Sequence, residues 1–122
     1  MPEDNKLIIP HPVIDSQVQA YNKHNLDAFC AHYQDDASLY LHPSGELLVQ
    51  GQAELRQRYA KSFAIPGLRV IIASRLLVGT LVIDEELIYT DENPDLPRRA
   101  VLIYEVAGSL IRRAWICRDD PG

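Results

Sequence analysis

The second half of the chain changes from helical to strand periodicity, and this change constrains the possible fold more than any other feature. Four segments there are rich in Val, Ile, Leu and Tyr and contain few breakers: residues 68–78, 80–90, 99–107 and 109–118. Turn-forming residues separate them at 79–80 and 107–109, and a longer polar loop with prolines spans 91–97. Four long strands joined in series predict an antiparallel meander.

The first half has the periodicity of helices that precede this sheet. Apolar side chains recur at helical spacing in three segments: about 12–23, the segment after the N-cap residue Asn25, and about 52–64. Between them, residues 37–42 alternate as a strand does, and 47–49 could form a short return strand. Helices first and strands last predict an α+β fold in which the helices cover one face of the sheet. We expect one domain over residues 12–120, preceded by a loose arm over residues 1–11.

Composition excludes several classes of protein. The net charge of -5 argues against a nucleic-acid-binding protein, which needs a basic face to offset phosphate charge. No apolar stretch approaches the roughly 18–20 residues that span a bilayer, and residues 1–6 lack the pattern of a secretory signal, so we expect a cytoplasmic protein without a membrane partner. The two cysteines form no CxxC pair, no spacing indicates a metal site and no Gly-rich phosphate loop occurs, so we expect no metal and no cofactor.

Five motifs occur in order along the chain: residues 21–29 (YNKHNLDAF), 33–37 (YQDDA), 42–43 (HP), 51–56 (GQAELR) and 111–115 (IRRAW). Together they resemble the NTF2-like superfamily, which includes SnoaL-like polyketide cyclases and ketosteroid isomerases. The resemblance covers residues 12–118. Two details differ from the pattern: His42 stands where many members have aspartate, and an extra residue follows Gly108.

This resemblance implies a cone-shaped fold, in which N-terminal helices pack on a curved, mostly antiparallel sheet. It implies a pocket between the helices and the concave face of the sheet, suited to a small apolar molecule. It also implies a homodimer formed through the outer face of the sheet.

Strand alternation selects the side chains that would line such a pocket. The resemblance places Ile116 and Arg118 inward on the last strand and Trp115 outward. By the same alternation Leu102 and Tyr104 face inward on the preceding strand.

A tight turn at 79–80 pairs Arg75 with Asp84 and Ala73 with Glu86. Arg75, Asp84 and Glu86 therefore share one face of the sheet, and the pairing alone leaves open whether it is the inner face.

His42 is the first candidate for a general base, because an unperturbed imidazole titrates near about pH 6.5. It also stands where the resemblance places the carboxylate base of ketosteroid isomerases. If His42 faces inward, Tyr40 does too. Tyr104 is a candidate donor to a substrate carbonyl oxygen. The alternative interpretations are a hydrogen-bonded histidine at a strand end and a tyrosine that fills the core.

Asp84 and Glu86 are candidate acids or bases, since burial disfavours the ionised form of a carboxyl group. The alternative is a structural salt bridge with Arg75. Arg118 could bind a carboxylate or phosphate group, or lie at the rim. The full set of candidate ligand contacts is Tyr40, Tyr59, Phe63, Arg75, Leu102, Ile116 and Arg118.

The sequence departs from both named activities of the superfamily. The tyrosine and aspartic-acid positions of the isomerase oxyanion hole align with Gln17 and Leu102, and Ile116 occupies the position of the cyclase aspartate. Three hypotheses follow. The chain is an enzyme that moves a proton next to a carbonyl without a cofactor, a non-catalytic dimeric module that binds a ligand or protein, or a hydratase or hydrolase in which Asp84 or Glu86 activates water.

Overall fold

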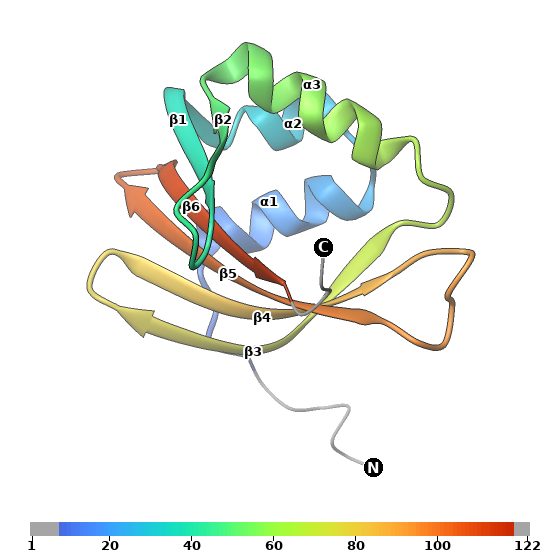
Figure 1. Ribbon diagram of the computed structural model, residues 1–122. Coiled ribbons are helices and arrows are strands. Elements are labelled where there is room, and N and C mark those ends of the chain that lie inside the picture. The colour runs from blue at the N-terminus through green and yellow to red at the C-terminus, as the bar shows by residue number, and fades with distance from the viewer. Residues whose placement is uncertain (1–7, 119–122) are drawn as a thin grey trace.

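The computed structural model describes residues 8–118 (Figure 1). Its elements in chain order are α1 (Pro12–Asn22), α2 (Leu26–Cys30), β1 (Tyr33–Leu41), β2 (Leu47–Gln50), α3 (Gln52–Phe63), β3 (Arg69–Val78), β4 (Leu81–Tyr89), β5 (Arg98–Ala107) and β6 (Leu110–Arg118). The predicted α+β class and the four-stranded meander are confirmed. Residues 1–7 of the predicted arm, and residues 119 and 120 of the predicted domain, lie outside the described residues.

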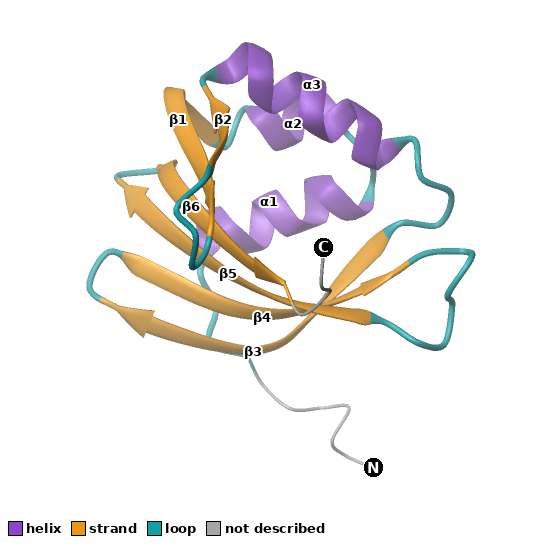
Figure 2. Cartoon of the chain, in the orientation of Figure 1, coloured by secondary structure: helices purple, strands orange, loops and turns teal. Residues whose placement is uncertain are grey.

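One six-stranded sheet, in the order β2-β1-β6-β5-β4-β3, forms the frame of the molecule. Neighbouring strands are antiparallel except for β1 and β6, which run parallel. The sheet curves, and all three helices lie on its concave side (Figure 2). The residues that begin α1 and α2 act as expected: Pro12 occupies the first turn of α1, and the Asn25 side chain accepts a hydrogen bond from the Ala28 N–H.

The core lies between the helices and the concave face of the sheet. Ile14, Phe29 and Leu55 come from the three helices, and all are fully buried. Facing them, Leu39 and Ile111 are buried from the strand side. Burying side chains of this size contributes roughly 1.5–3 kcal/mol each, so this layer holds the helices on the sheet.

A β-bulge in β3 changes the predicted register. Arg75 lies opposite Asp84 as expected, but Ile72 rather than Ala73 lies opposite Glu86. The prediction for Ala73 is wrong because the bulge inserts one residue into β3, which a simple count from the turn does not include. The face shared by Arg75, Asp84 and Glu86 is the inner one, since all three are buried beneath the helices.

The outer face of the sheet carries Trp115, as predicted, with its ring stacked on that of Tyr40 at 6.0 Å between centroids. Ile71, Leu76 and Val78 of β3 are exposed. The homodimer expected to form through this face stays a prediction. No helix within residues 8–118 is both long enough and apolar enough to span a bilayer.

Candidate functional site

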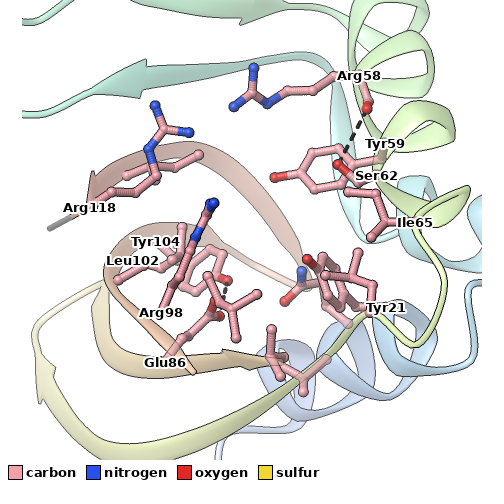
Figure 3. A pocket seen from close by; sticks show the side chains of 17 residues that line it. Tyr21, Arg58, Tyr59, Ser62, Ile65, Glu86, Arg98, Leu102, Tyr104 and Arg118 are labelled. Atoms are coloured by element: carbon pink, nitrogen blue, oxygen red, sulfur yellow. Dashed lines mark hydrogen bonds between the residues drawn. The ribbon is translucent and has the colours of Figure 1, made fainter. Parts of the chain in front are cut away.

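A cavity of about 160 Å³ lies between the helices and the concave face of the sheet (Figure 3). Side chains of α1, α3 and strands β3 to β6 line it, so elements far apart in the sequence meet there. Its polar wall includes Tyr21, Tyr59, Tyr104 and Glu86. Leu102 and Ile116 supply part of the apolar wall, in the inward orientation expected from alternation for Leu102 and from the family resemblance for Ile116.

A second cavity of about 410 Å³ adjoins the first, and both share Ile65 and Arg98 in their walls. It lies between the loop after α3 and the loop after β4. The two loops are in close contact: the Asp91 N–H donates to the Pro66 carbonyl at 3.0 Å, and a Cβ at Gly67 would overlap the Asp91 carboxylate. Gly67 also has a φ of 72°, a backbone conformation that favours glycine. Both the contact with Asp91 and this conformation therefore require glycine at position 67.

Glu86 is the one acidic side chain in the wall of the first cavity among the described residues, and no histidine joins it. It is 7% exposed, and the Tyr104 hydroxyl donates to its Oε2 at 3.4 Å. Burial, reinforced by the nearby charge of Asp84 and opposed by the hydrogen bond from Tyr104, raises the pKa of Glu86 to about 8. The carboxyl group therefore holds its proton near neutral pH and releases it in mildly basic solution.

Three tyrosines, Tyr21, Tyr59 and Tyr104, line the cavity together with Glu86. Burial is the largest cause that raises the pKa of Tyr59, to about 12, and it holds the pKa values of Tyr21 and Tyr104 well above the usual range. The charge of Glu86 raises the pKa of all three tyrosines further, and the Tyr104 hydroxyl is bonded to it directly. At neutral pH these groups are hydrogen-bond donors suited to a carbonyl oxygen.

Gln17 contributes an unpaired polar atom to the cavity wall. Its Nε2 donates to the Tyr33 hydroxyl at 3.5 Å, but its Oε1 has no hydrogen-bond partner among the described residues. The side chain is 3% exposed. Buried polar atoms without partners are uncommon in folded proteins, so a ligand that donates a hydrogen bond would complete this site.

Asp84 and Arg75 are buried on the inner face of the sheet but do not line the cavity. The Arg75 guanidinium holds both Asp84 oxygens, with Nε–Oδ1 at 2.6 Å and Nη2–Oδ2 at 3.0 Å. Its Nη1 also donates to Asp15 Oδ1 at 2.7 Å and to the Ile9 carbonyl at 2.9 Å. Asp84 is therefore held in an ion pair away from the cavity wall, and four of the five Arg75 N–H groups donate to acceptors of the protein itself.

His42 and Tyr40 do not face the interior, and that prediction is wrong. The parallel pairing of β1 with β6 places Leu39 beside the buried Ala114 and Tyr40 beside the outward Trp115. His42 follows β1 in a turn, is exposed, and does not line the cavity. The alternation of β1 is thus set by its partner strand, one residue out of phase with the expectation.

The remaining candidates divide by position. Tyr59 and Arg118 line the cavity, as does Tyr104. Phe63 instead packs edge-on against Tyr21 at 5.3 Å between ring centroids, behind the cavity wall. Whether the lining residues bind a ligand stays a prediction.

Sequence reasoning did not propose five of the polar lining residues as site residues, and two of these had a usable signal: the five are Gln17, Tyr21, Arg58, Ser62 and Arg98. Arg98 lies six residues before Tyr104 on the same strand, so the alternation that turns Tyr104 inward also turns Arg98 inward. Tyr21 follows Gln17 by one helical turn, so both lie on the same face of α1. Arg58 resembled a solvated residue of α3 and had no such signal.

The buried carboxyl group makes stability depend on pH. Because the pKa of Glu86 is about 8 in the folded protein against 4.5 ordinarily, the folded state binds more protons than the unfolded state between these values. We expect this component of the free energy of unfolding to be complete below about pH 4.5 and to fall by up to about 1.4 kcal/mol per pH unit until about pH 8. Urea unfolding of the wild type and Glu86→Gln across this range measures it. If the free energy of unfolding changed with pH in the same way for both proteins, the raised pKa of Glu86 would be contradicted.

Within residues 8–118, no three His, Cys, Asp or Glu side chains are grouped as a metal site requires. None of the curated proteins is significantly similar to the chain in sequence.

Solved structures share its fold. A cystatin-fold protein from Novosphingobium aromaticivorans is 23% identical, with a TM-score of 0.74 over 86% of this chain and 94% of that one. A candidate ketosteroid isomerase from Kribbella flavida is 16% identical, with a TM-score of 0.74 over 91% and 78% of the two chains. A candidate polyketide cyclase from Sinorhizobium meliloti is 14% identical, with a TM-score of 0.73 over 88% and 94%. These likenesses confirm the cone-shaped NTF2-like fold. The sequence matches the SnoaL-like domain over residues 14–114, and the chain therefore belongs to the SnoaL-like family.

Proposed function

We propose that the protein is a cofactor-independent enzyme that moves a proton next to a carbonyl group in a small, mostly apolar molecule. The observation that carries this proposal is the position of Glu86, the one carboxyl group in the cavity wall among residues 8–118, with the Tyr104 hydroxyl bonded to it. Two structural neighbours named as a candidate isomerase and a candidate cyclase support this reaction class. Glu86 takes the role that the sequence suggested for His42.

The reaction needs no other reactant. Ionised Glu86 takes a proton from the carbon beside the carbonyl, and the electron pair of that bond moves to the carbonyl oxygen. The hydroxyls of Tyr21 and Tyr59, both directed at the cavity, stabilise this oxyanion (Figure 3). Glu86 then returns the proton to carbon, which regenerates the carboxylate.

The volume of the cavity limits the size of the part of the substrate that reacts. An engineered cavity of about 150 Å³ holds benzene. The first cavity, at about 160 Å³, has room for one ring or a short chain, and a four-ring steroid does not fit in it alone. A larger molecule would extend past Ile65 and Arg98 into the second cavity.

Solvent-deuterium exchange tests the proposal. The purified protein would be incubated in D2O with a panel of small cyclic ketones, diketones and lactones, and deuterium uptake beside the carbonyl followed by NMR. We expect at least one compound to exchange faster than the buffer background. Glu46→Gln, which neutralises an exposed carboxylate outside the cavity wall, serves as the control and should retain the activity. Background exchange for the whole panel would leave the protein as a ligand-binding module.

A further inference from the structure

Three arginines line the first cavity, and each comes from a different part of the chain. Arg58 lies on α3, Arg98 is the first residue of β5 and Arg118 is the last of β6. Figure 3 shows their side chains bordering the same pocket that Glu86 and Tyr104 line. Arg98 and Arg118 are largely exposed and Arg58 is half-buried, so these side chains form the mouth while Glu86 is buried within.

Most other arginines of the described chain have acidic partners. The ion pairs are Arg56–Asp27, Arg75–Asp15, Arg75–Asp84, Arg99–Glu85 and Arg113–Glu105. Within residues 8–118, Arg58 and Arg98 form no ion pair. Arg69 and Arg112 form none either, but of these four arginines only Arg58 and Arg98 line the cavity. At Arg58 and Arg98 the mouth thus carries positive charge that no ion pair within residues 8–118 neutralises.

The positive charge extends into the cavity. Glu86, the one acidic residue of the wall among those described, keeps its proton near neutral pH and so does not neutralise the arginines. The pKa of Tyr21 is raised chiefly by burial, and the charges of Arg98 and Arg58 oppose that rise. Both guanidinium groups line the same cavity as this hydroxyl.

We propose, on the basis of the proposed function, that the molecule bound in this cavity is a small carboxylate with an apolar, carbonyl-bearing body. Its carboxylate faces the mouth, where Arg98 and Arg58 bind it, and its apolar part extends to Glu86. Guanidinium groups match carboxylates in geometry and charge, and such bonds are roughly twice as strong as neutral ones. The unpaired Oε1 of Gln17 accepts a hydrogen bond from a hydroxyl or enol of the same ligand.

Benzoate and benzamide form a matched pair of probes, equal in size and shape and different in charge. At pH 7 and low salt, isothermal titration calorimetry or NMR titration should show benzoate binding at least about tenfold more tightly than benzamide. Raising the salt concentration should weaken benzoate binding and leave benzamide binding nearly unchanged. Arg98→Gln and the double variant Arg58→Gln/Arg98→Gln should lose the preference. Arg112→Gln, which removes an exposed charge outside the cavity wall, is the control and should keep it.

Equal affinities for the two probes, or no binding of either, would overturn the inference. So would a benzoate preference that survives Arg58→Gln/Arg98→Gln or that is lost equally in Arg112→Gln. The outcome is separable from the proposed function, because Glu86→Gln should keep the benzoate preference. A wild type that prefers benzoate but exchanges no proton with any carbonyl compound counts against the catalytic proposal alone.

Discussion

Glu86→Gln is expected to lower the rate of proton exchange by about 10²–10⁴-fold and to leave ligand binding largely intact. The amide has the same shape as the carboxyl group but cannot ionise to a carboxylate, so it cannot take the proton from carbon. The wild-type rate should rise about tenfold per pH unit below about pH 8 and level off above it, because only ionised Glu86 takes a proton and its pKa is about 8. Rate measurements by deuterium uptake between pH 5 and 10 give both results.

His42→Gln distinguishes the two candidate bases. His42 is exposed and does not line the cavity, so its replacement should leave the exchange rate within about twofold of the wild type. If His42→Gln abolishes exchange while Glu86→Gln does not, the assignment of the proton carrier is wrong. Binding of the same ketone, measured on each variant by NMR titration, separates loss of chemistry from loss of the pocket.

Arg75→Met is expected to lower the free energy of unfolding by about 3–5 kcal/mol, the usual cost of removing one partner of a buried ion pair. The Arg75 and Asp84 side chains are both 0% exposed, so the Asp84 carboxylate would be left buried without its partner. Asp15 and the Ile9 carbonyl would lose a donor in the same variant. Urea unfolding monitored by circular dichroism measures the loss.

Two comparison variants show that burial causes this effect. The double variant Arg75→Met/Asp84→Leu removes both charges and should recover much of the lost stability, since no unpaired charge remains. Glu105→Gln breaks the partly exposed pair with Arg113, whose Nε lies 2.6 Å from Glu105 Oε1, and should cost at most about 1 kcal/mol. A loss below about 1 kcal/mol for Arg75→Met would contradict the ion-pair account.

The fold could be predicted from the sequence because its signals are local. Helical spacing before residue 64, strand composition after residue 68 and the turn residues between them each act over a few positions. The inward position of Arg118 followed from the family resemblance, and that of Tyr104 from alternation on the strand that pairs with it.

The predicted site failed where a long-range contact decides orientation. The alternation of β1 depends on its pairing with β6, which places Tyr40 beside Trp115 although 75 positions separate them, and no local pattern records that pairing. The bulge in β3 likewise has no turn residue to mark it. Local patterns also do not distinguish Asp84 from Glu86. Asp84 is paired with Arg75 and Glu86 lines the cavity, and this difference depends on the tertiary contacts of each side chain.

Asp84 affects both the stability of the fold and the pKa of Glu86. It is held by Arg75 on one side, and on the other its negative charge raises the pKa of Glu86. Exchanging this ion pair for apolar residues would therefore remove the Asp84 charge and make Glu86 more acidic. In such a variant the pH at which Glu86 ionises, and with it the onset of the proposed proton transfer, would move downward.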